Sequence, residues 1–227
     1  MAKYTRLHVL TCMIETGLVP LFYHDDPEVA AKIILACLDG GARCIEFTNR
    51  GDGAQRVFTE IFERFKEDPR LILGAGTILD PATATLYLQE GANFIVGPTF
   101  NQEVARLCNR RMVPYTPGCA TATEISNAQE MGVEICKVFP GDELGGPAFV
   151  QAVRGPLPWS RLMPTGGVDP DKENVSAWIK AGVACLGMGS KLISTKVVVA
   201  GDYSAITENV RHVLEWIQEA RAGKPAI

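Results

Sequence analysis

Two ionisable side chains stand inside otherwise apolar runs, Lys137 within residues 134–138 and Glu46 within residues 43–47. Burial disfavours the ammonium form of a lysine, and a neutral amine can attack a ketone to form a Schiff base. Burial also raises the pKa of a carboxyl group, which suits Glu46 to proton transfer. The alternative interpretation is structural: the two residues could form an ion pair, or Lys137 could extend its amine to the solvent.

Further residues of the chain are suited to binding an anion. Arg50 follows the run that holds Glu46 and could bind a carboxylate through two hydrogen bonds, although an arginine in a loop is more often a solvated surface residue. The sequence Thr-Gly-Gly at 165–167 and the sequence Gly-Met-Gly-Ser at 187–190 resemble phosphate cradles, because glycines allow backbone N–H groups to approach an anion. Lys191 could add a positive charge there. Either glycine loop alone could be an ordinary tight turn.

Short apolar runs alternate with helical stretches along the chain. A glycine that can end a helix precedes an apolar run at Gly41, Gly91, Gly132 and Gly182. The predicted strands are 18–23, 43–47, 71–74, 93–96, 113–116, 134–138, 161–163 and 184–187. The predicted helices are 27–39, 54–66, 81–90, 101–110, 121–131, 147–154, 172–181 and 203–221, with an extra helix at 5–16 before the first strand.

Eight strands, each followed by a helix, predict an α/β fold of the (β/α)₈ TIM-barrel type. We expect one domain over residues 1–227, because no linker or low-complexity segment divides the chain. A doubly wound open sheet is the competing architecture, but no Gly-x-Gly-x-x-Gly follows the first strand. The active site of such a barrel lies at the carboxyl ends of its strands, where the polar residues above are predicted to gather.

Composition excludes several classes of function. The net charge of −4 gives no reason to expect nucleic acid or a membrane surface as a partner, and no apolar run is long enough to span a bilayer. Seven scattered cysteines and the absence of a signal-peptide pattern predict a cytoplasmic protein without disulfides. We expect no metal site, because the three histidines lack ligand spacing; His24-Asp25-Asp26 could hold a hard cation, but it also matches a helix start.

Taken together in order and spacing, several motifs resemble one enzyme family over about residues 17 to 220. The motifs are Val19-Pro20, Ile45-Glu46-Phe47-Thr48-Asn49-Arg50, Gly74-Ala75-Gly76-Thr77, Lys137-Val138-Phe139-Pro140, Pro164-Thr165-Gly166-Gly167-Val168, Gly187-Met188-Gly189-Ser190 and Gly201-Asp202-Tyr203. With them the chain resembles the 2-keto-3-deoxy-6-phosphogluconate (KDPG) and 4-hydroxy-2-oxoglutarate (KHG) aldolases.

The resemblance implies a class I aldolase, a lyase without metal or cofactor, usually a homotrimer of barrels. Its small-molecule partners would be a phosphorylated 2-keto acid and pyruvate, with KDPG cleaved to pyruvate and glyceraldehyde 3-phosphate. KHG, cleaved to pyruvate and glyoxylate, would be a further substrate. By residue match, Lys137 forms the Schiff base and Glu46 moves protons. The match gives substrate-binding roles to Arg50 and Thr77 (carboxylate end), Pro98 and Phe139 (pocket walls), and Thr165, Gly166, Gly167 and Ser190 (phosphate end).

Departures from the family pattern leave the substrate open. Thr99 follows Pro98, Gly141-Asp142 follow Pro140, and the last glycine loop is one residue longer than usual. The substrate could instead be the galactonate analogue, 2-keto-3-deoxy-6-phosphogalactonate. The same residues are also compatible with a phosphate-binding barrel isomerase or epimerase that forms no covalent intermediate, and with a non-catalytic sensor of sugar acids.

Overall fold

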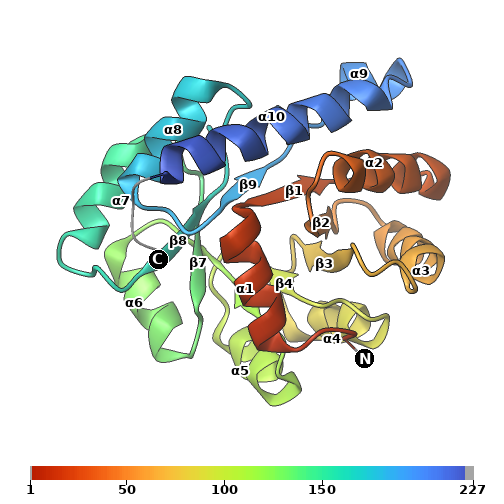
Figure 1. Cartoon of the computed structure of the whole chain (residues 1–227). Helices are drawn as coiled ribbons and strands as arrows, with labels where there is room; N and C mark the ends of the chain where they lie inside the picture. The colour runs from red at the N-terminus through yellow and green to blue at the C-terminus, as the bar shows by residue number, and fades with distance from the viewer. Residues whose placement is uncertain (1, 223–227) are drawn as a thin grey trace.

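The computed structural model describes residues 2–222, in which parallel strands alternate with helices (Figure 1). The strands are β1 (Leu18–Phe22), β2 (Cys44–Thr48), β3 (Ile72–Gly76), β4 (Ile95–Val96), β5 (Tyr115–Thr116), β6 (Gly118–Cys119), β7 (Ile135–Val138), β8 (Arg161–Pro164) and β9 (Leu186–Met188). The helices are α1 (Arg6–Thr16), α2 (Pro27–Asp39), α3 (Ala54–Phe65), α4 (Pro81–Gln89), α5 (Gln102–Arg111), α6 (Ala122–Glu130), α7 (Gly146–Arg154), α8 (Lys172–Ala181), α9 (Thr195–Val199) and α10 (Tyr203–Arg221).

The strands form a curled, parallel arrangement of two sheets. One sheet has the order β5-β4-β3-β2-β1-β9 and the other has the order β6-β7-β8. All the pairings within them are parallel, as the alternation of strands and helices predicts. A bridge between Thr165 and Gly187 connects the end of β8 to β9. The predicted α/β class with a parallel sheet is therefore confirmed.

Helix signals in the sequence place most helices correctly. The predicted helices 27–39, 172–181 and 203–221 agree with α2, α8 and α10 at both ends. Asp26 begins α2, where its side chain accepts a hydrogen bond from the N–H of Glu28 at 2.8 Å, and Pro27 occupies the first turn. Asp171 caps α8 in the same way. Residues 24–26 thus serve as a helix start.

Two elements, β6 and α9, have no counterpart in the prediction. The predicted strand 113–116 is observed as β5 at 115–116, and a further strand, β6, follows directly after Pro117. A proline has no N–H to donate to a ladder, so it interrupts the strand. The short helix α9 is absent from the predicted elements. Ser194 caps it, and its residue Val199 is 83% exposed, so α9 lacks the buried apolar stripe by which a helix is recognised in a sequence.

Apolar side chains pack on both faces of the strands. One cluster fills the space between the strands and the surrounding helices. A second, smaller cluster joins residues on the other face, such as Ile72, Ile135 and Met163, to Val9 and Met13 of α1. Figure 1 shows α1 lying across the middle of the molecule, with the other helices arranged around the strands. Within residues 2–222, no helix is long and apolar enough to span a bilayer.

Candidate active site

Lys137 and Glu46 lie on the strand face that points away from the surrounding helices. The thiol of Cys136, the residue before Lys137, lies 3.9 Å from the carbonyl oxygen of Ile125 in α6. Because side chains alternate along a strand, Lys137 therefore points the opposite way. Glu46 alternates in the same manner with Phe47, which packs among the helices. Lys137 is 6% exposed and Glu46 is 1% exposed, so both ionisable groups are buried.

The electrostatics of this pair follow from its burial. Burial lowers the pKa of Lys137; the charge of Glu46 opposes that shift, and the charge of Arg50 adds to it. Burial likewise raises the pKa of Glu46, against the opposing charges of Lys137 and Arg50. Glu46 Oε2 is buried without a hydrogen-bond partner. The arrangement favours a neutral amine beside a carboxyl group that can exchange a proton, with one oxygen available to a bound molecule.

Gly76 provides the space that Glu46 occupies. A Cβ atom at position 76 would overlap Glu46 Oε1 and Cδ and would lie 2.6 Å from its Cγ. The register places Gly76 opposite Thr48, and the next residue, Thr77, has a positive φ of 61°. Such a φ is uncommon for a β-branched residue, and strained backbone of this kind tends to occur at functional sites. A glycine is therefore needed at position 76, at the end of β3, to leave room for the carboxylate of Glu46.

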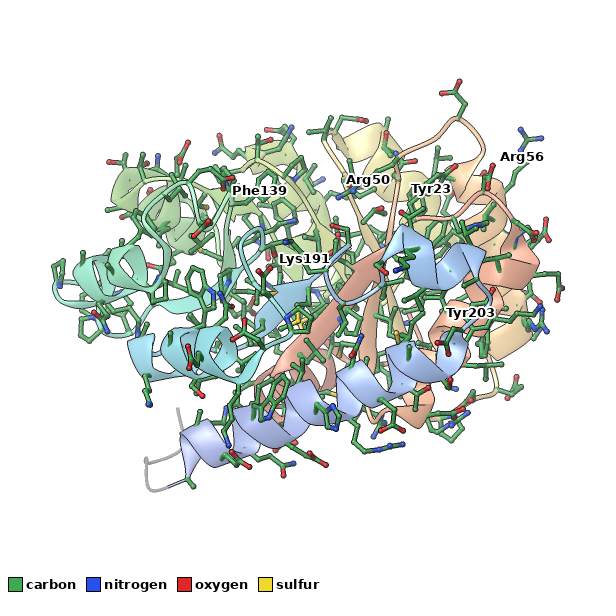
Figure 2. The ribbon with its side chains drawn as sticks, turned by 90° about the horizontal axis from the view of Figure 1, so that it is seen from above. Tyr23, Arg50, Arg56, Phe139, Lys191 and Tyr203 are labelled. Carbon is green, nitrogen blue, oxygen red and sulfur yellow. The ribbon has the colours of Figure 1, made fainter. Side chains whose placement is uncertain are left out.

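An open cavity of about 630 Å³ is lined by Arg50 and Phe139, two residues that act on or contact Lys137. Phe139 connects the cavity to Lys137, because its ring lines the cavity and its centroid lies 5.0 Å from Lys137 Nζ. Figure 2 shows Phe139, Arg50 and Tyr23 in the upper half of the view, with Lys191 nearer its centre. The predicted site residues in the lining are Arg50, Phe139, Thr165, Gly166, Gly167 and Ser190. The other four predicted residues are not among its lining residues: Lys137, Glu46, Thr77 and Pro98.

One wall of the cavity is formed by the two glycine loops. Gly166 and Gly167 both have positive φ, 87° and 70°, and the Thr165–Gly187 bridge holds the two loops together. Thr165 Oγ1 is buried without a hydrogen-bond partner. Lys191 also lines the cavity, and its Nζ lies 3.8 Å from Asp169 Oδ2, so a carboxylate partly offsets its positive charge. Glycine turns, an unpartnered hydroxyl and a nearby cation suit an anionic ligand.

Some lining residues were not anticipated from the sequence. Tyr23 and His24, after β1, and Val198 and Val199, in α9, also line the cavity. The only sequence signal for Tyr23 and His24 is their place at the end of the first strand, where barrel sites gather polar residues. Among residues 2–222, no group of three or more His, Cys, Asp or Glu side chains could hold a metal ion.

Known proteins match the chain along most of its length. A model of the family described as "KDPG and KHG aldolase" matches residues 9–209. The KHG/KDPG aldolase of Escherichia coli K12 is 32% identical over 89% of this chain and 93% of its own. The 2-dehydro-3-deoxy-phosphogluconate aldolase of Pseudomonas aeruginosa is 34% identical over 91% and 92%. A crystal structure of the Legionella pneumophila KDPG aldolase, with pyruvate captured as a covalent carbinolamine, superposes with a TM-score of 0.82 at 25% identity, covering 90% of this chain and 97% of that one.

Proposed function

The chain belongs to the KDPG and KHG aldolase family and is a carbon–carbon lyase, and we propose that it works through a Schiff base on Lys137. Its proposed substrate is 2-keto-3-deoxy-6-phosphogluconate, with 4-hydroxy-2-oxoglutarate as a further one. The observation that carries the proposal is a buried lysine, beside a buried carboxyl group, whose nitrogen lies next to a cavity-lining ring. The covalent carbinolamine with pyruvate in the Legionella enzyme supports it.

The reaction follows from the charge of the nitrogen. Neutral Lys137 attacks the C2 carbonyl, and loss of water from the carbinolamine gives a protonated imine. This cation accepts the electron pair of the C3–C4 bond, so the bond breaks to leave an enamine. Glu46 removes the proton of the C4 hydroxyl, and the carbonyl product, glyceraldehyde 3-phosphate, departs. Protonation of the enamine at C3 and hydrolysis of the imine then release pyruvate and restore the amine. General acid–base catalysis of this kind contributes about 10²–10⁴-fold.

The remaining residues divide between the two ends of the substrate. Arg50 and Thr77 hold the carboxylate end, and Pro98 and Phe139 form the walls. At the phosphate end are Thr165, Gly166, Gly167 and Ser190. Support comes from Arg50, Phe139 and the glycine loops, which line one cavity. Thr77 follows Gly76 directly and so lies at the end of the strand beside Glu46.

We further infer that the chain forms one domain, a closed (β/α)₈ barrel with α1 covering its amino-terminal end. The Thr165–Gly187 bridge joins the two sheets on one side, and on the other side β5 and β6 are separated by Pro117 alone. Gly97 lies between them, because its N–H donates to Thr116 and its carbonyl accepts from Gly118. The packing of Val9 and Met13 against strand residues supports the role of α1.

A cytoplasmic homotrimer is the proposed form of the enzyme. The seven cysteines are all free, as expected in a reducing compartment. Leu7 and Met112, which are 77% and 67% exposed, line one groove and offer apolar surface to another subunit. Light scattering coupled to gel filtration tests the trimer, because a monomer or dimer mass would contradict it.

Borohydride trapping tests the chemistry. With pyruvate and borohydride, the wild-type protein should gain one reduced pyruvyl group on Lys137, located by peptide mass spectrometry. Lys137→Met should abolish both the adduct and turnover, whereas the matched variant Lys191→Met should keep the adduct. An isomerase or epimerase working without a covalent intermediate would show no mass change in any variant. Pyruvate release from gluconate, galactonate and unphosphorylated substrates then identifies the preferred one.

A further inference from the structure

A buried hydroxyl on β5, which contacts the strand of Lys137, has no hydrogen-bond partner. Thr116 of β5 is 0% exposed, and its Oγ1 makes no hydrogen bond. Its neighbour Tyr115 points toward the helices, where its hydroxyl contacts the carbonyl of Thr99 and the N–H of Asn101. Thr116 therefore points to the opposite face of the strand, the face on which Lys137 and Glu46 lie.

The register places Thr116 on the run of chain beside β7, close to the level of Lys137. Gly118 of β6 pairs with Lys137, and Thr116 precedes Gly118 by two residues along the same run, so Thr116 lies one step nearer the amino-terminal end of the strands. The N–H of Lys137 donates to the carbonyl of Pro117 at 2.8 Å, which ties β7 to the chain immediately after Thr116. β5 and β7 are also in direct contact. Thr116 is therefore adjacent to the backbone that carries the reactive amine.

The other side chains around this position are apolar. Val96 pairs with Thr116 from β4, and Val19 of β1 and Met163 of β8 belong to the same inner cluster. The charged groups that act on Lys137 are Glu46 of β2 and Arg50 of the loop after it. An unpaired buried hydroxyl destabilises a fold, because it loses its hydrogen bonds to water and gains none in return. A valine would fill the same volume without that cost, so the hydroxyl calls for a functional explanation.

We propose that Thr116 is a positioning residue for Lys137, whose hydroxyl accepts a hydrogen bond from Nζ–H when the nitrogen is cationic. The two cationic states are the ammonium and the protonated imine. The imine nitrogen carries a single N–H, so a hydrogen bond from it to the Thr116 hydroxyl fixes the plane of the C=N bond. Glu46 then remains available to move the proton of the C4 hydroxyl. This inference rests on the proposed Schiff base at Lys137.

The hydroxyl should stabilise the cation more than the neutral amine, since hydrogen bonds to charged donors are the stronger ones. Removing it therefore lowers the pKa of Lys137 further, and the amine stays neutral to lower pH. The same loss destabilises the protonated imine, on which bond cleavage depends. The two effects have opposite signs: imine formation extends to more acidic conditions while the turnover of the covalent intermediate slows.

Thr116→Val separates the positioning role from simple packing. We expect kcat to fall about tenfold and the acid limb of kcat/KM to move down by about one pH unit, the size expected of one charge-assisted hydrogen bond. The melting temperature should rise, because the unpaired hydroxyl is gone. Thr116→Ser keeps the hydroxyl and should restore both the rate and the acid limb. Borohydride trapping with pyruvate should still label Lys137 in both variants.

Thr48→Val is the matched control. Thr48 is also fully buried, but its hydroxyl donates to the carbonyl of Phe22 at 3.2 Å. That variant should lose stability while the position of the acid limb stays unchanged. The inference is overturned if Thr116→Val keeps the wild-type pH profile, or if Thr116→Ser is impaired as much as Thr116→Val. In either case intact labelling of Lys137 would leave the Schiff base standing, whereas loss of labelling in the wild-type protein would remove the proposed function itself.

Discussion

A single methyl group on Gly76 should disable the carboxyl group of Glu46 without changing any charged residue. In Gly76→Ala the added Cβ would lie 2.6 Å from Glu46 Cγ, where ordinary contacts begin at 3.4 Å, and it would overlap the carboxyl atoms. Glu46 Cγ must therefore move away by about 0.8 Å (3.4 − 2.6), and the carboxyl group, which the new Cβ approaches more closely, must move further. Misplacing a reacting group by about 1 Å can cost roughly 10²-fold in rate.

We therefore expect kcat for pyruvate release to fall about 10²-fold in Gly76→Ala, or about 2.7 kcal/mol in the activation free energy. Borohydride trapping of pyruvate on Lys137 should persist, because the amine is not displaced. Overpacking of this kind costs about 1–3 kcal/mol of stability. The measurements are steady-state pyruvate release, the mass of the trapped adduct, and the melting temperature.

Gly74→Ala is the control for steric strain alone. Gly74 lies on the same strand, two residues earlier, and a Cβ there would overlap the buried ring of Phe94 instead of Glu46. The variant should lose comparable stability but much less activity. Displacement of Glu46 is ruled out as the cause if Gly76→Ala keeps kcat within about threefold of wild type, a small part of the general acid–base contribution. It is also ruled out if the two alanine variants lose activity equally.

Three further predictions concern the other groups around the site. Arg50→Gln should move the acid limb of kcat/KM to higher pH, because Arg50 helps to lower the pKa of Lys137; a downward or absent shift in the pH–rate profile would contradict this electrostatic role. Ser190→Asp should weaken phosphorylated substrates at least tenfold more than unphosphorylated ones, because it places a carboxylate beside the glycine loops; KM values for the two classes check it, and equal losses would remove the phosphate role of that loop. Met13→Ala should destabilise the fold by about 2–5 kcal/mol, since Met13 is fully buried between α1 and the strands; urea denaturation measures the loss, and a cost below about 1 kcal/mol would show that α1 is loosely attached.

The sequence was enough to predict the α/β class, most helix boundaries and the principal ionisable pair. Caps such as Asp26 and Asp171 act through their own neighbours along the chain, so local sequence predicts where α2 and α8 begin. Lys137 and Glu46 could be recognised because a charged residue inside an apolar run is costly wherever the fold places it. The division of β5 from β6 at Pro117 and the helix α9 were missed, because both depend on short segments with weak periodicity.

The tertiary structure decided what the residues do to one another. Gly76 has the same sequence signature as any strand glycine, and only the pairing of β2 with β3 brings its missing side chain against Glu46. Thr116 is an ordinary strand residue in the sequence, and only the register of three strands places its unpaired hydroxyl on the run of chain beside Lys137. The physical reason is that a charged residue and the apolar residues around it are neighbours in the sequence. Contacts and strand register, by contrast, depend on segments far apart in the chain.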